Sequence, residues 1–181
     1  MQKKERFTTR SLAVIGLLSA LVFVSSWMQI EVGPARFHLG NSFCALAGLL
    51  FGPLTGGLAA GFGSMLFDFT NPAYISGCLI TFATKFVIGY LAGLIAHRGP
   101  VSTRKDILGT LAGSVAYIVL YMAKSFVEMY WIEGQAMGAV QVRLAAKLSA
   151  SCVNAAVALV VATLLAAALR PALRRAKVLA Q

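Results

Sequence analysis

The sequence predicts an all-α integral membrane protein with six transmembrane helices and with both the N- and C-termini in the cytoplasm. The 181 residues are 59% hydrophobic and 12% charged, whereas soluble domains are about 45–50% apolar and about 25% charged. Several apolar runs reach the roughly 20 residues that a helix needs to cross a bilayer. Most basic residues lie between these runs. The composition excludes a soluble globular enzyme, a disordered chain and a disulfide scaffold.

The first predicted helix covers residues 11–30 and follows a basic N-terminal segment. A secretory signal peptide has the same order, but its apolar core is shorter and ends in small residues at a cleavage site. Here the apolar run continues through Trp27 to Ile30 without an Ala-x-Ala site. We therefore expect this segment to be retained as a transmembrane helix.

Two shorter helices, near 38–51 and 54–68, are predicted on either side of Gly52-Pro53. Proline lacks a backbone donor and restricts the residue before it, so this dipeptide indicates a turn. The two helices either cross the membrane or form a re-entrant hairpin enclosed by protein. Both alternatives return the chain to the same side, so the predicted orientation does not depend on the choice.

Three longer helices follow at 77–96, 107–132 and 141–169, and complete a single six-helix domain over residues 1–181. With the N-terminus inside, 11 of the 16 basic residues fall on the cytoplasmic side, as the positive-inside rule expects. They are Lys3, Lys4, Arg6, Arg10, Arg98, Arg104, Lys105, Arg170, Arg174, Arg175 and Lys177. The net charge of +10 is thus a topology signal. It does not indicate nucleic-acid binding, because no RNA-type aromatic motif accompanies it.

No motif for catalysis or metal binding is present. Cys44, Cys78 and Cys152 are far apart in apolar runs, which is typical of small buried residues and not of a disulfide framework or zinc site. The chain has no Walker motif, no His-Glu-x-x-His and no nucleophile elbow. We expect neither enzymatic activity nor a metal or cofactor in this chain.

Three lysines lie inside predicted membrane helices: Lys85, Lys124 and Lys147. At 1.5 Å per residue each is about 10–14 Å below the outer end of its helix, so all three share one level. An ionised lysine at this depth costs a few kcal/mol, which makes it a candidate functional residue. We expect the three side chains to face a shared polar cavity in the outer half of the membrane.

Two other interpretations of these lysines remain open. Each lysine could snorkel to the outer headgroups, although its stem covers only part of the distance. Glu128 lies four residues after Lys124 and could neutralise it as an i,i+4 pair. Two or three ammonium groups in one cavity favour a ligand with a carboxylate, a phosphate or many carbonyl acceptors.

Other candidate binding residues lie at the same level or in the outer loops. Asn154 is two turns deeper than Lys147 on the same helix face, where it forms either the polar floor of the cavity or a helix–helix hydrogen bond. The Gly33-Pro34 and Asn71-Pro72 dipeptides indicate turns. The segments around these turns present Arg36, His38, Asn41, Asn71 and Tyr74 at the outer mouth.

Several segments resemble the substrate-binding S components of energy-coupling factor (ECF) vitamin transporters. They are Arg36-Phe-His-Leu-Gly-Asn41, Ala45-Leu-Ala-Gly-Leu-Leu-Phe-Gly-Pro53, Gly56-Gly-Leu-Ala-Ala-Gly61, Asp68-Phe-Thr-Asn-Pro72, Thr81-Phe-Ala-Thr-Lys85 and Leu169-Arg-Pro-Ala-Leu-Arg174. The similarity covers nearly the whole chain in length, helix count and motif order. It implies a six-helix subunit with an outward-facing vitamin site that two outer loops close. It does not specify the vitamin: pantothenate, cobalamin, riboflavin and B6 forms all remain candidates.

The resemblance also implies partners: a transmembrane coupling (T) subunit and two cytoplasmic ATPase (A) subunits in a prokaryotic cell membrane. The family docks its first helix on the coupling subunit through an Ala-x-x-x-Ala pattern. Gly16 and Ala20 occupy the matching positions here, and small residues four apart allow close helix contact. ATP hydrolysis then belongs to the partners.

Two other functions compete with this one. A self-sufficient secondary transporter of a small anionic solute would favour an internal repeat and an intramembrane carboxylate for ion coupling. Only Glu128 could serve as that carboxylate, and the two halves show no repeat. A membrane scaffold without a ligand leaves the three lysines unexplained.

Overall fold

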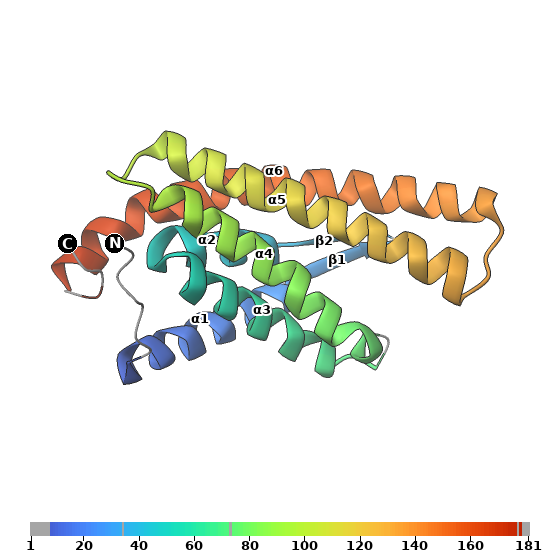
Figure 1. Cartoon of the computed structure of the whole chain (residues 1–181), viewed down its shortest axis with the longest axis horizontal. Coiled ribbons are helices and arrows are strands. Elements are labelled where there is room, and N and C mark those ends of the chain that lie inside the picture. The colour runs from blue at the N-terminus through green and yellow to red at the C-terminus, as the bar shows by residue number, and fades with distance from the viewer. Residues whose placement is uncertain (1–7, 34, 73, 177, 179–181) are drawn as a thin grey trace.

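The computed structural model describes residues 8–33, 35–72, 74–176 and 178, which form six helices with a short β-hairpin after the first (Figure 1). In chain order the elements are α1 (Thr9–Trp27), β1 (Gln29–Val32), β2 (Ala35–His38), α2 (Gly40–Phe51), α3 (Pro53–Phe69), the 3-10 turn η1 (Ile75–Gly77), α4 (Cys78–Ala96), α5 (Thr103–Phe126), the π-helical segment η2 (Val127–Ile132) and α6 (Met137–Arg175). Lys3, Lys4, Arg6, Pro34 and Lys177 lie outside the described residues.

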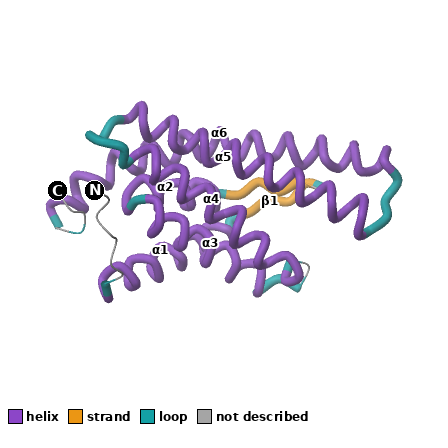
Figure 2. The backbone as a smooth tube through the Cα atoms, viewed as in Figure 1, coloured by secondary structure: helices purple, strands orange, loops and turns teal. Residues whose placement is uncertain are grey.

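The helices form an elongated bundle with two distinct ends (Figures 1 and 2). At one end lie the β-hairpin, the α3–α4 connection and the α5–α6 connection; we call this the hairpin end. At the other lie the start of α1, the α2–α3 turn, the α4–α5 connection and the end of α6. This second end is the basic end, because its segments carry Arg10, Arg98, Arg104, Lys105, Arg170, Arg174 and Arg175.

The hairpin corrects two predicted boundaries. The helix expected over 11–30 ends at Trp27, and residues 29–32 pair antiparallel with 35–38. The chain reverses at Gly33, whose φ of +58° is accessible to glycine without a steric penalty. The helix expected over 38–51 therefore begins at Gly40, and His38 belongs to β2.

Most other predicted helix boundaries differ from the structure by a few residues. The turn between the helices expected at 38–51 and 54–68 lies at Gly52, with φ of +88°, and Pro53 occupies the first turn of α3, where its missing donor costs nothing. The helix expected over 107–132 begins at Thr103 and changes to η2 after Phe126. The last helix extends beyond 141–169 in both directions and includes Pro171.

α2 is enclosed by the other helices, and every residue in it except Phe43 and Phe51 is buried. Glycines make this enclosure possible. A Cβ on Gly48 would lie 2.1 Å from the Gly89 carbonyl oxygen of α4, and one on Gly56 would lie 2.3 Å from Gly48 Cα. Both distances are far below van der Waals contact, so α2, α3 and α4 meet backbone to backbone.

Within the described part of the chain, four segments are long and apolar enough to cross a membrane: Thr9–Trp27, Ile75–Ala96, Thr103–Ile132 and Met137–Arg175. α2 has 12 residues and α3 has 17, which correspond to lengths of about 18 and 26 Å. Both are shorter than the roughly 30 Å of hydrocarbon in a bilayer. The structure thus contains four full-length apolar helices and a shorter pair joined at Gly52.

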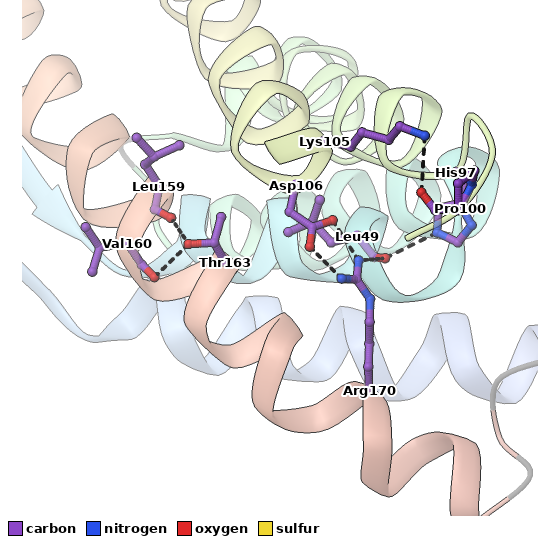
Figure 3. Close-up of polar contacts among 9 residues, drawn as sticks. All are labelled: Leu49, His97, Pro100, Lys105, Asp106, Leu159, Val160, Thr163 and Arg170. Atoms are coloured by element: carbon purple, nitrogen blue, oxygen red, sulfur yellow. Dashed lines mark hydrogen bonds and ion pairs between the residues drawn. The ribbon is translucent and has the colours of Figure 1, made fainter. Parts of the chain in front are cut away.

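A buried ion pair ties α6 to α5 and α2 at the basic end (Figure 3). The Arg170 guanidinium binds both carboxylate oxygens of Asp106, with one distance of 2.7 Å, and donates to the Leu49 carbonyl at 3.0 Å. Nε2 of His97 lies 3.2 Å from the same carbonyl. The last carbonyls of a helix have no partner within it, so these side chains satisfy the end of α2.

Candidate functional site

A cavity of about 770 Å³ opens toward the hairpin end of the bundle. Its walls come from α1, β1, β2, α3, α4, α5, η2 and α6 and from the α3–α4 connection, which includes η1. The three lysines predicted to share one level, Lys85 on α4, Lys124 on α5 and Lys147 on α6, all line it. The sequence prediction that these side chains face one cavity therefore agrees with the geometry.

Each lysine has a different immediate partner. Lys85 is buried, donates to Oδ1 of Asn41 and lies 4.3 Å from the ring centroid of Tyr117. Lys124 forms the expected i,i+4 ion pair with Glu128, at 3.1 Å. Lys147 donates to the Ser125 hydroxyl at 3.3 Å.

Gly77 makes room for the Lys124 head group. A Cβ on this glycine would lie 2.9 Å from Lys124 Nζ and 4.0 Å from Glu128 Oε1. A side chain at position 77 would therefore displace the ammonium group of the ion pair. The absence of a side chain at Gly77 thus leaves the Lys124–Glu128 pair its observed position beside η1.

Two tyrosines of α5 form an aromatic wall. The rings of Tyr117 and Tyr121 stack with centroids 5.6 Å apart and an interplanar angle of 10°. Lys147 Nζ lies 5.7 Å from the Tyr121 centroid, so both rings carry a cation near one face. Such a surface suits a planar ligand ring with polar substituents.

The strand β2 supplies Arg36 and His38 to the cavity. The Arg36 guanidinium lies 4.0 Å from the ring centroid of Tyr74, which is in the α3–α4 connection. Partial burial raises the pKa of Tyr74, against the opposing charge of Arg36. Burial, together with the charges of Lys85 and Arg36, lowers the pKa of His38 well below its ordinary value. This imidazole is therefore neutral at pH 7.

Asn154 holds β2 against α6. Its Oδ1 accepts from the His38 backbone N–H at 3.1 Å, and its Nδ2 donates to the Arg36 carbonyl at 2.8 Å. It lines a second, smaller pocket beside the cavity and is absent from the wall of the cavity itself. Neither a cavity floor nor a helix–helix hydrogen bond describes this side chain, which bridges a helix to a strand.

Two of the remaining candidates lie away from the mouth. Asn41 is buried in the first turn of α2 behind Lys85, so its expected place at the outer mouth is wrong. Asn71 lies in the α3–α4 connection but not in the cavity wall. Its backbone accepts from the Tyr74 N–H at 2.9 Å and donates to the Asp68 carbonyl at 3.2 Å. It shapes the turn that carries Tyr74.

Gly16 and Ala20 lie on α1 and do not line the cavity. Both are exposed, and a Cβ on Gly16 would meet nothing within 4 Å. Leu12, Leu17 and Val24 are exposed on the same helix. α1 thus presents an apolar surface with small residues four apart.

Several lining residues were not predicted from the sequence, among them Tyr117, Tyr121, Asp68 and Ser125. The signal for the tyrosines was available: Tyr117, Tyr121, Lys124 and Glu128 recur at helical spacing, on one face of α5. Ser125 and Asp68 carry no such signal. Among the described residues, no group of three His, Cys, Asp or Glu side chains could hold a metal ion.

Known proteins share this architecture. The structure is similar to that of FolT bound with folic acid, with a TM-score of 0.63 and 22% identity over 85% of this chain and 89% of that one. It is also similar to an S component of a bacterial ECF transporter, with a TM-score of 0.59 and 18% identity over 89% of this chain and 98% of that one.

Sequence comparison gives the family. An "Uncharacterized protein in gap 3'region" of Pyrococcus woesei is 32% identical over 100 residues, 55% of this chain and 66% of that protein. The model of the ECF-type riboflavin transporter S component family matches residues 6–171. This match covers most of the chain and confirms the resemblance seen in its motifs. The chain belongs to the family of ECF-type riboflavin transporter S components.

Proposed function

We propose that this chain captures a water-soluble vitamin in the cavity at the hairpin end and delivers it to an ATP-driven transporter. The observation that carries the proposal is the cavity of about 770 Å³ whose wall holds Lys85, Lys124 and Lys147. Ionisable residues within membrane helices are costly and usually mark a ligand or ion site. Pockets of about 300–1,000 Å³ accommodate molecules of vitamin size.

The ligand we propose contains a planar ring. The aromatic wall of Tyr117 and Tyr121 supports this, since stacked tyrosines offer a flat surface. The matching family is named for riboflavin transport, and the structure of FolT contains bound folic acid. Both compounds have fused aromatic rings. Arg36, His38, Tyr74, Lys85, Lys124, Glu128 and Lys147 would contact the ligand, while Asn41, Asn71 and Asn154 would position these groups.

We infer a six-crossing topology with the hairpin end outside and both termini in the cytoplasm of a prokaryotic cell. The clustering of basic residues in segments of the other end supports this orientation. α2 and α3 are too short to span the full hydrocarbon separately. The enclosure of α2 by the other helices supports a short crossing shielded from lipid, while α3 exposes Phe62, Leu66 and Phe69 on its outer face.

The proposed partners are a transmembrane coupling subunit and two cytoplasmic ATPase subunits. The exposed apolar face of α1 supports contact with the coupling subunit at Gly16 and Ala20. Without a membrane partner this face would meet only lipid. A self-sufficient secondary transporter would need no such partner, so dependence on the coupling module separates the two functions.

Uptake and binding measured side by side test the proposal. Cells that express the chain with its coupling module should accumulate radiolabelled riboflavin, folate or pantothenate, and cells that express the chain alone should not. Gly16→Leu and Ala20→Leu should reduce uptake at least tenfold, because a large side chain prevents close helix contact. Binding by the purified variants should remain within threefold of the original protein.

The matched control is Leu17→Ala, which changes the same exposed helix without adding bulk. Uptake by the chain alone would contradict the partner-dependent mechanism and favour a secondary transporter. Equal loss of uptake and binding in Gly16→Leu would show that position 16 supports the fold and not the coupling contact.

A further inference from the structure

A small pocket of about 30 Å³ adjoins the main cavity between β2, α5 and α6. It shares Arg36, His38 and Lys147 with the main cavity and extends past them to Ser151 and Asn154. This volume is far smaller than the 770 Å³ of the main cavity. It can admit one small polar group at the edge of a larger ligand, but not a ring.

The charges around this small pocket are unbalanced. Among the residues that the structure describes, no Asp or Glu lines it, whereas Arg36 and Lys147 both do. Among the described residues, neither cation has a carboxylate within the 4.0 Å of an ion pair. Their closest groups are the Tyr74 ring for Arg36 and the Ser125 hydroxyl and Tyr121 ring for Lys147. Within this part of the chain neither side chain thus forms an ion pair, although Glu31 is the cross-strand neighbour of Arg36 and Asp68 lines the main cavity.

The other two cations of the cavity differ. Lys124 is neutralised by Glu128 at 3.1 Å. Lys85 belongs to the cavity wall but is only 7% exposed, donates to Asn41 and lies over the Tyr117 ring. An anionic ligand group would therefore meet its strongest complementary charge between Arg36 and Lys147.

Hydrogen bonds hold the backbone that carries Arg36 and His38 and orient Lys147 toward the Ser125 hydroxyl. Both polar atoms of the Asn154 side chain bind the backbone of β2, at His38 and Arg36. Nδ1 of His38 accepts from the Gly40 N–H at 3.1 Å, which leaves Nε2 as the ring donor. Arg36, Lys147 and His38 are thus three donors carried by backbone that is already ordered. This favours binding, because less conformational entropy is lost when the ligand binds.

We propose that the ligand carries a carboxylate or phosphate, and that this anionic group binds between Arg36 and Lys147 while the ring lies in the main cavity. This inference rests on the proposed function and narrows its substrate class to acidic vitamins and their phosphorylated forms. Charge-assisted hydrogen bonds from a guanidinium and an ammonium are stronger than neutral ones. In this proposal, the preference for an anionic ligand arises from the small pocket and not from the cavity as a whole.

The experiment compares probes that differ only in their anionic group. The purified full chain in nanodiscs is titrated by calorimetry with riboflavin and riboflavin 5′-phosphate, pyridoxal and pyridoxal 5′-phosphate, and folic acid and its diamide. In the pair that binds, the anionic member should bind at least tenfold tighter than the neutral one. Which pair binds also shows whether the anion is a phosphate or a carboxylate.

Substitutions test whether the affinity difference between anionic and neutral ligands depends on Lys147. Lys147→Met should weaken the anionic member at least tenfold and the neutral member less than threefold, and Lys147→Arg should restore most of the difference. Arg143→Met is the matched control, because Arg143 lies one turn earlier on α6, is exposed and does not line either pocket. It should change neither affinity. Thermal melts confirm that each variant is folded.

The outcomes separate the two claims. If the neutral member binds as tightly as the anionic one, or if Lys147→Met weakens both equally, the anion pocket is wrong and the vitamin-binding function stands. If no member of any pair binds, the proposed function fails and the anion pocket fails with it.

Discussion

At the residue scale, buried polar side chains connect segments that are far apart in the chain. Arg170 and Asp106 join α6 to α5, and both side chains are almost fully buried, at 11% and 3% exposed. Lys85 and Asn41 join α4 to α2, and Asn154 joins α6 to β2. In a protein whose surface faces lipid, these contacts hold specific positions that apolar packing alone would leave less defined.

Asp106→Asn should destabilise the protein strongly. The change leaves the Arg170 guanidinium buried without its counter-charge, and breaking a buried pair in this way typically costs about 3–5 kcal/mol. The melting temperature in detergent should fall clearly. The double variant Asp106→Leu with Arg170→Met should recover part of the loss, since it removes both charges. An unchanged melting temperature for Asp106→Asn would contradict the role assigned to this pair.

Residue contacts were predictable only where they are local. The Lys124–Glu128 pair follows from i,i+4 spacing, and the common level of the three lysines follows from helix geometry. The bonds of Asn154 to β2 span more than 100 positions in the chain, so no local pattern indicates them. For the same reason the burial of Asn41 behind Lys85 was missed.

At the element scale, close backbone contact depends on individual glycines. Gly48→Ala should destabilise the bundle by about 1–3 kcal/mol, as overpacking of a core does, because its Cβ would lie 2.1 Å from the Gly89 carbonyl oxygen. Gly16→Ala is the matched control: nothing lies within 4 Å of its Cβ, and alanine favours helix by about 1 kcal/mol.

Thermal melts of the two alanine variants, purified in the same detergent, measure this difference. Gly48→Ala should melt at a lower temperature than the original protein, and Gly16→Ala at the same or a higher temperature. Equal melting temperatures for the two variants would mean that α2 and α4 can move apart without a loss of stability. That result would contradict the role assigned to Gly48.

Helices were predictable from apolar runs, whereas the short strands were not. Each strand has four residues, too few for an alternating pattern to stand out beside an apolar helix. The Gly52 turn followed directly from glycine and proline chemistry. The change to η2 near the cavity reflects local hydrogen bonding that composition does not encode.

At the scale of the whole molecule, the two ends of the bundle differ in charge and in proposed function. The basic end carries the proposed cytoplasmic surface, and the hairpin end carries the cavity with its few enclosed cations. The family could be identified from motifs in the sequence, and the family comparison confirms it. The substrate could not be identified from the sequence, because the cavity wall is assembled from helices and strands along most of the chain, whose side chains meet only in the folded protein.

The central claim is that this chain alone binds a vitamin in the cavity around the three lysines. Native mass spectrometry of the chain, purified from cells without its partners and without ATP, tests it most directly. The spectrum should show a single vitamin bound at one copy per chain. Lys85→Met should lose it, because Lys85 links the cavity wall to Asn41 and Tyr117, whereas Arg143→Met should retain it. A spectrum without any bound vitamin after supplying riboflavin, folate and pantothenate, or equal retention in both variants, would contradict the account.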